Sequence, residues 1–222
     1  KYDRNRDSEL YQENRERANN DGHASVEDSN MFIYDFFYGV DMADALVQSM
    51  IVGADGMIAW SLDDAMHTGN DRGDPDNLKR WGMWNILGEE LHGNPEDEEI
   101  RPWYYPWSLM TRYFPEGSNI LEIQQLDKRG LRIVAAEYQG EYTIAIVNSA
   151  HPEYDITLKT DESVQKSFHR YVYTQDDRPK ESEGNYPVPK EQIDDMNLEE
   201  GMDVTVPGLS FQLYTSQSVP QF

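Results

Sequence analysis

The amino-acid sequence predicts an α/β region followed by an all-β region. Two features precede residue 118: apolar residues at helical spacing, and a short, wholly apolar run that is typical of a buried strand. After it, short segments of alternating polar and apolar residues are separated by turn formers, which is the pattern of an antiparallel sheet. We place the boundary in the turn at 115–118, so the predicted domains are 1–118 and 119–222.

A helix and a strand form the most informative stretch of the first region. Apolar residues recur at four-residue spacing from Met42 to Met50, which predicts an amphipathic helix over 40–52 with Gly53 as its stop. The run 57–60 has no polar alternation, so a strand covered on both faces is expected. Together they make one αβ step of a parallel sheet or barrel.

A long polar loop and a second helix complete the first region. The loop, 61–100, is rich in Gly, Asp and Trp, and loops of this length are uncommon without a function. A helix should begin between Pro102 and Pro106, since proline is tolerated in the first turn, and should end at Pro115. Its aromatic residues are expected to pack in the core.

The all-β region contains several strand-length runs, which predict a small antiparallel sandwich. They are 131–137, 142–148, 155–158, 168–174, 202–206 and 209–215. Turn residues such as Gln139 and Gly140 separate them. The acidic stretch 175–200 has few apolar side chains and is expected to be a long surface loop.

The composition excludes several classes of function. The formal net charge is −23, so nucleic acid is excluded as a partner because its phosphates would be repelled. There is no Cys, which rules out disulfides and Cys-based zinc sites, and no apolar run has the roughly 18 residues that span a membrane. The polar opening, 1–30, is expected on the surface with a helical turn near 9–17. Because the chain opens at Lys1 without a signal segment, we expect a processed, truncated or fragmentary chain.

Polar side chains gather in the loop after the predicted strand, where α/β barrels assemble their ligand sites. They are Asp63, Asp64, His67, Asn70, Asp71 and Arg72. Potential metal ligands in this loop are Asp63, Asp64, His67, Asp71 and Asp74. Neither HExxH nor EF-hand spacing is present, so no metal site is predicted and only a structural Ca²⁺ stays open. Trp81 and Trp84 either line an outer ligand subsite or are buried beneath the loop.

Several segments together resemble the C-terminal end of a clan A (β/α)8 glycoside hydrolase, a TIM-barrel enzyme. They are IYDFFYGVDMADALVQSMIVGADGMIAWSLDD at 33–64, LKRWGMW at 78–84, RPWYYPWSLMTRYFPEGS at 101–118 and the closing VPGLSFQLYTS. In that family a helix precedes barrel strand 8, the strand ends in Trp, a last helix closes the barrel and a β-sandwich follows. The resemblance implies that 1–118 is the C-terminal portion of the barrel and 119–222 the sandwich.

The resemblance also implies substrate binding without catalytic residues in this chain. The family's acid/base Glu follows strand 4 and its nucleophile Glu follows strand 7, close together as retaining hydrolysis requires. Both strands would precede 57–60, and the opening contains no strand ending in Glu; Glu27, the one alternative considered, does not follow a buried strand. The implied substrate-binding residues are Trp60, whose ring would lie under a sugar, and Asp63, Asp64, His67 and Arg72. The structural alternatives are a buried Trp, acids that cap a turn and a His with a structural partner.

A lone barrel strand cannot satisfy both of its edges, so we expect a companion polypeptide that supplies the rest of the barrel. The expected substrate is a poly- or oligosaccharide, no cofactor is expected, and the expected location is extracellular or periplasmic. Two other classes stay open. One is a non-catalytic carbohydrate-binding module, and the other is a structural interaction domain whose acidic surface keeps an assembly soluble.

Overall fold

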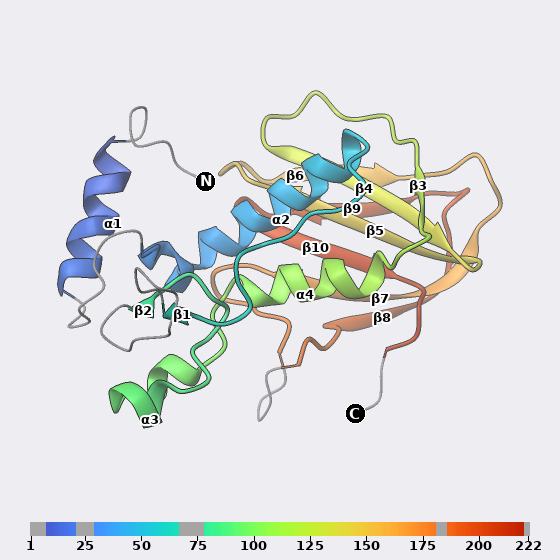
Figure 1. Ribbon diagram of the computed structural model, residues 1–222. Helices are drawn as coiled ribbons and strands as arrows, with labels where there is room; N and C mark the ends of the chain where they lie inside the picture. Colours follow the sequence, from blue (N-terminus) through green and yellow to red (C-terminus); the bar gives the residue numbers. More distant parts are fainter. Residues whose placement is uncertain (1–7, 21–28, 67–77, 181–185, 220–222) are drawn as a thin grey trace. The chain divides into compact units, whose positions relative to one another are not determined.

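The computed structural model describes residues 8–20, 29–66, 78–180 and 186–219 (Figure 1). The chain divides into two compact units, which we describe separately. Unit 1 is Lys1–Tyr38 with Ile58–Pro102, and unit 2 is Gly39–Met57 with Trp103–Phe222. These units cut the chain at other places than the predicted boundary after residue 118.

Unit 2 contains a six-stranded antiparallel sheet with the order β3-β4-β5-β10-β7-β8. Its strands are β3 (Asn119–Leu121), β4 (Leu131–Tyr138), β5 (Glu141–Asn148), β7 (Gln165–Tyr173), β8 (Glu191–Asn197) and β10 (Ser210–Thr215). A second sheet pairs β6 (Tyr154–Leu158) with β9 (Met202–Val206). Apolar residues of both sheets, such as Ile146 and Val204, share one buried cluster. The predicted antiparallel, sandwich-like arrangement is therefore confirmed.

The turn between β4 and β5 shows why these residues form a hairpin. Gln139 and Gly140 have φ angles of 55° and 82°, so both central residues of the turn are left-handed. Such a two-residue turn matches the twist of the flanking strands, and Tyr138 pairs directly with Glu141. The sequence predicts this turn.

Two helices of unit 2 pack on one face of the large sheet. From Gly39 onward α2 (Phe36–Ile51) lies so close to β7 that a Cβ on Gly39 would come 2.4 Å from the Tyr173 hydroxyl oxygen. The Tyr113 hydroxyl of α4 (Tyr104–Tyr113) lies 2.6 Å from that of Tyr171. Because Tyr171 and Tyr173 alternate with one residue between them, both helices cover the same face of β7. The predicted stop of the first helix is confirmed, since Gly53 is left-handed with φ 77°.

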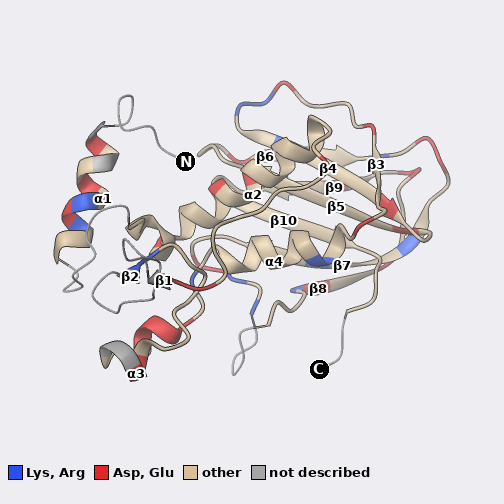
Figure 2. Cartoon of the chain, in the orientation of Figure 1, with Lys and Arg blue, Asp and Glu red and all other residues tan. Residues whose placement is uncertain are grey.

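Unit 1 is built from short elements. They are α1 (Ser8–Asn20), η1 (Met31–Tyr34), β1 (Ala65–Met66), β2 (Leu78–Lys79), α3 (Gly88–His92) and η3 (Pro95–Glu98). Acidic residues of α3 are drawn in red in Figure 2. The opening is more than a surface excursion, because Asn14 of α1 is buried, donates to the Ser29 carbonyl at 2.6 Å and accepts from the Met31 N–H at 2.7 Å.

The expected strand at 57–60 is not formed, and this prediction is wrong for the chain as the structure describes it. These residues lie outside any strand, and Ile58 is 95% exposed rather than covered on both faces. A strand needs neighbours that pair with its N–H and C=O groups, and none of the described strands runs beside this segment. A TIM barrel is likewise not seen in the described residues.

Two strands of the large sheet were not predicted. β8 lies within the stretch expected to be a loop, 175–200, and β3 precedes the first predicted strand. β8 has the polar sequence EQIDDMN and pairs with β7 alone, at the edge of the sheet. An edge strand whose residues are mostly exposed has no apolar alternation from which it could be predicted.

Candidate functional site

The site of interest in unit 1 lies in the segment that begins at Trp60. The Trp60 side chain is 65% exposed and meets the ring of Trp81 edge to face, with 6.5 Å between ring centroids. The Trp60–Ser61 peptide bond is cis. A large exposed aromatic ring is the kind of surface that stacks on the C–H face of a sugar.

The carboxylate of Asp64 is the anchor of this segment. Its Oδ1 accepts from the backbone N–H groups of Trp81 at 3.0 Å and Gly82 at 2.9 Å. Arg101 binds it in a bidentate manner, with both nitrogen–oxygen distances 2.6 Å. The two side chains are almost fully buried, 0% exposed for Asp64 and 2% for Arg101. Burial lowers the pKa of Arg101, but the bond to Asp64 outweighs it and the pKa is raised.

A second buried pair lies beside the first. Arg80 Nη2 donates to Asp97 Oδ2 at 2.8 Å, and both side chains are about 5% exposed or less. The Tyr34 hydroxyl accepts from Arg80 and from Arg101, each at 3.2 Å, and donates to Asp97 at 3.3 Å. Burial raises the pKa of Tyr34 to about 12, so the phenol stays neutral between the two guanidinium groups.

Asp63 differs from Asp64 in being partly exposed. Its Oδ1 accepts from the backbone N–H groups of Asp64 at 2.8 Å and Ile86 at 3.2 Å. Partial burial raises the pKa of this carboxyl, although these two hydrogen bonds act in the opposite direction. No residue of the described ranges donates to Oδ2, so this oxygen can accept from a ligand.

The backbone of this segment is pinned to a second one. Met83 N–H donates to the Leu62 carbonyl at 2.9 Å, and Asp64 N–H donates to the Trp84 carbonyl at 3.0 Å. At Gly82 the approach is so close that a Cβ would come 2.4 Å from the carbonyl carbon of Asp63. Only glycine fits at that position.

The structure brings together some of the predicted site residues. Trp60, Asp63 and Asp64 lie in one short segment, and Trp81 and Trp84 lie in the segment pinned to it. His67 and Arg72 lie outside the described residues, so their roles stay predictions. Sequence reasoning did not find Arg101, Arg80, Asp97 and Tyr34, because they come from distant segments with no shared spacing.

In the described part of the chain, no group of three His, Asp or Glu side chains could hold a metal ion. Asp71 and Asp74 lie outside that part, so a structural Ca²⁺ is untested. None of the described helices has the length and apolar character needed to cross a bilayer.

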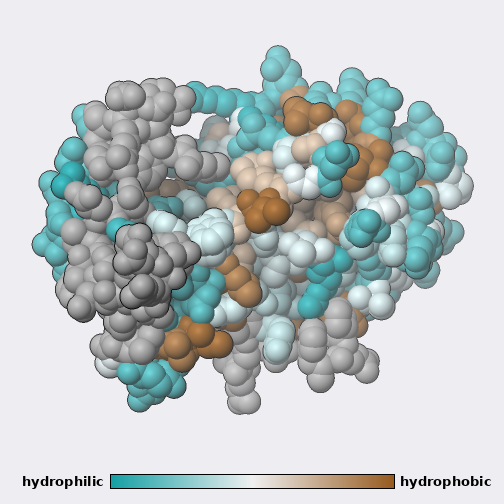
Figure 3. All heavy atoms as spheres, viewed as in Figure 1, coloured by the Kyte–Doolittle hydropathy of each residue, from teal (hydrophilic) through white to brown (hydrophobic). Residues whose placement is uncertain are grey.

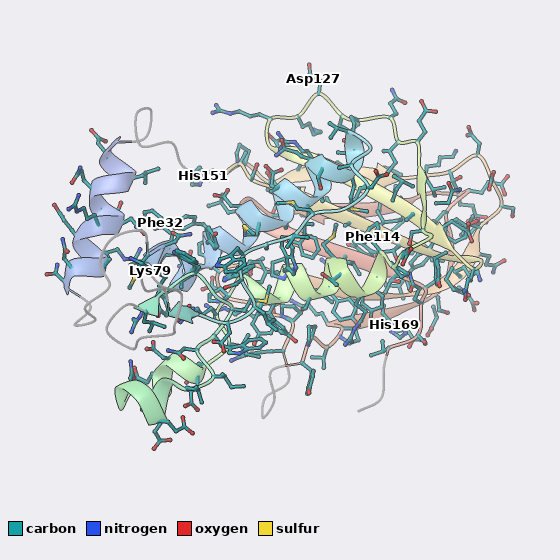
Figure 4. The ribbon with its side chains drawn as sticks, viewed as in Figure 1. Phe32, Lys79, Phe114, Asp127, His151 and His169 are labelled. Carbon is teal, nitrogen blue, oxygen red and sulfur yellow. The ribbon has the colours of Figure 1, made fainter. Side chains whose placement is uncertain are left out.

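Unit 2 holds a groove of about 870 Å³. Its apolar lining comes from α2, the turn after it, α4 and β3, and includes Leu46, Met50, Met57, Trp107, Phe114 and Ile120. Phe114 is labelled at the end of α4 in Figure 4, and hydrophobic residues lie over α2 in Figure 3. The two helices are therefore apolar on the side of the sheet and also along this groove, whereas a surface helix has one apolar stripe.

Comparison with known proteins finds similarity of fold. No protein-family model matches the chain, and no curated protein matches it in sequence. Among solved structures, a glycoside hydrolase family 30 subfamily 8 xylanase from Clostridium acetobutylicum is similar with a TM-score of 0.57 and 11% identity, over 83% of this chain and 40% of its own. A GH30 endoxylanase from Clostridium papyrosolvens has a TM-score of 0.52 and 13% identity, over 86% and 40%. The GH39 enzyme from Xanthomonas axonopodis pv. citri has a TM-score of 0.52 and 9% identity, over 89% and 44%. The chain thus shares a fold with less than half the length of these glycoside hydrolases.

Proposed function

We propose that this chain is the C-terminal part of a (β/α)8 glycoside hydrolase that acts on a poly- or oligosaccharide. The observation that supports this proposal most is the similarity of fold to three glycoside hydrolases. The similarity extends over more than four-fifths of this chain but over less than half of each of those enzymes. The acid/base and nucleophile Glu of such an enzyme would lie outside this chain. The chain itself contributes the sugar-binding residues of the barrel mouth.

Trp60 is the proposed sugar platform. Its ring is largely exposed, and Asp63 lies three residues further along with one carboxylate oxygen available to a sugar hydroxyl. A flat apolar face beside a hydrogen-bond acceptor suits a pyranose, which has C–H groups on its faces and hydroxyls at its edge. His67 and Arg72 remain proposed members of this site.

A companion polypeptide is the second part of the proposal. Ile58 is almost fully exposed, and the neighbouring Trp60 and Leu62 are at least 60% exposed. These side chains belong to residues outside the described strands, and an exposed apolar run of this kind is characteristic of a surface that is covered by another part of the protein.

The test is hydrolysis of xylan by the native assembly recovered through a tag on this chain. We expect reducing sugar from the assembly and none from this chain alone. Trp60→Ala should lower kcat/KM by about tenfold, since one aromatic contact is worth about 1 kcal/mol or more. The matched control is Tyr186→Ala, which removes another half-exposed ring, from unit 2, and should leave the rate unchanged.

Three results would contradict the proposal. They are an assembly that hydrolyses no β-linked glycan, a chain that hydrolyses xylan alone at the rate of the assembly, and a Trp60→Ala assembly that matches the control. Sugar binding without any turnover would favour a non-catalytic carbohydrate-binding module instead.

A further inference from the structure

We propose that Asp64 and Arg101 are positioning residues, whose buried pair fixes the segment that carries Trp60 and Asp63 in its ligand-binding geometry. This inference rests on the proposed function for the identity of the ligand. It assigns Asp64 a role different from direct contact with the sugar.

The segment that carries Trp60 and Asp63 needs an anchor. Its backbone meets residues 82–84 at an isolated bridge between Asp63 and Trp84, with hydrogen bonds of 2.9 Å and 3.0 Å. A loop held by such a bridge alone would sample many conformations, and ordering it would cost about 1 to 2 kcal/mol per residue. A sugar platform that must be ordered by its ligand binds weakly.

Asp64 supplies this anchor. Its Oδ1 takes three donors, the N–H groups of Trp81 and Gly82 and Nη1 of Arg101, while Oδ2 takes Arg101 Nη2. With its side chain fully buried, this carboxylate cannot reach a ligand. A bidentate guanidinium–carboxylate pair is directional, so it fixes orientation as well as distance.

Arg101 joins the segment that contains Asp64 to the one that contains Gly82 and Met83. Besides binding Asp64, its Nη1 donates to the Gly82 carbonyl at 2.9 Å, and its backbone N–H donates to the Met83 carbonyl at 2.8 Å. Its guanidinium also lies over the Tyr34 ring, 4.8 Å from the centroid. Lysine could keep the charge at this position but not the planar fork of donors.

The anchor is connected to the two exposed side chains, Trp60 and Asp63. The Asp64 N–H donates to Asp63 Oδ1, so the orientation of Asp64 directly sets that of its neighbour. Trp81, whose N–H binds Asp64, lies edge to face with Trp60. Loss of the pair should therefore move Trp60 and Asp63 together.

The experiment is fluorine NMR of the chain labelled with fluorotryptophan, with the Trp60 resonance assigned by Trp60→Phe. We expect Asp64→Asn and Arg101→Lys to shift or broaden the Trp60 resonance while the resonances of Trp103 and Trp107 in unit 2 stay in place. The unchanged unit 2 signals establish that unit 2 remains folded in the variants, and the fold of unit 1 is checked by the control variant below. In the native assembly the same variants should weaken binding of xylohexaose by about tenfold or more.

The matched control is Asp97→Asn, which breaks the other buried pair of unit 1, in which Asp97 binds Arg80 and accepts from the Tyr34 hydroxyl. It should destabilise unit 1 to a similar extent and leave the Trp60 resonance where it was. If Asp97→Asn moves that resonance as much as Asp64→Asn does, or if neither Asp64→Asn nor Arg101→Lys moves it, the positioning role is overturned. Failure of the proposed function would look different, because Trp60→Ala itself would then leave xylohexaose binding unchanged.

Discussion

Substitution of Gly82 by alanine should separate the two segments of the site. The added Cβ would lie 2.4 Å from the Asp63 carbonyl carbon, 2.5 Å from the Asp64 nitrogen and 2.8 Å from the Asp63 oxygen. All three are backbone atoms, so no side chain can rotate away. Because carbon atoms pack at about 3.5 Å or more, the segments must part by roughly 1 Å.

That movement sets the expected loss of stability. A shift of about 1 Å takes the hydrogen bond from Asp64 N–H to the Trp84 carbonyl, now 3.0 Å, beyond hydrogen-bonding range. Overpacking costs about 1 to 3 kcal/mol, and each lost hydrogen bond costs about 0.5 to 1.5 kcal/mol. We therefore expect Gly82→Ala to lower the free energy of opening of this site by about 1.5 to 4.5 kcal/mol.

Amide hydrogen exchange of peptides that cover 78–102 measures this loss. The expected change corresponds to exchange about 10 to 2,000 times faster. Gly56→Ala is the matched control, since a Cβ there meets nothing within 4 Å and the glycine has no left-handed φ. If exchange in Gly82→Ala stays within about twofold of that in Gly56→Ala, the close approach at Gly82 is not a constraint and the reasoning fails.

Two further predictions concern buried tyrosines. The pKa of Tyr34 is raised from 10.0 to about 12, so the unfolded chain releases this proton at lower pH than the folded chain does. The contribution of protonated Tyr34 to the free energy of unfolding is therefore complete below about pH 10. Between about pH 10 and 12 the free energy of unfolding falls by roughly 2 to 3 kcal/mol. Urea unfolding of Tyr34→Phe should lack this part of the alkaline decline, and an identical decline in both proteins would contradict the assignment. In unit 2, Tyr113→Phe leaves the Tyr171 hydroxyl without its 2.6 Å partner and should cost about 1 to 2 kcal/mol. The double variant with Tyr171→Phe should lose less than the sum of the single variants, whereas strict additivity would show that the two hydroxyls are not coupled.

The sequence predicts those parts of the fold that have local signals. The helix that ends at Ile51, shortly before Gly53, follows from apolar spacing and a left-handed glycine, and the β4–β5 hairpin follows from alternation and a turn at 139–140. β8 has no such signal, because an exposed edge strand takes its position from β7 and not from its own residues. The strand expected at 57–60 has the right composition, but a strand forms only beside other strands.

The site is predicted in its exposed members and missed in its buried ones. Trp60 and Asp63 stand out because an aromatic residue and an acid follow an apolar run. The partner of Asp64 is Arg101, 37 residues further along, and nothing in the spacing links the two. Buried ion pairs between distant segments are specified by tertiary packing, so a single sequence does not reveal them.

Hydrogen exchange of the backbone amides at 57–62 tests the central claim most directly. In this chain alone these amides lie outside any strand, so they should exchange at nearly the rate of an unfolded peptide. In the native assembly, recovered through a tag on this chain, we predict exchange at least about a hundredfold slower, because the companion's strands would pair with them. Equally fast exchange in the chain and in the assembly would contradict the claim that this segment becomes a strand when another polypeptide completes a barrel.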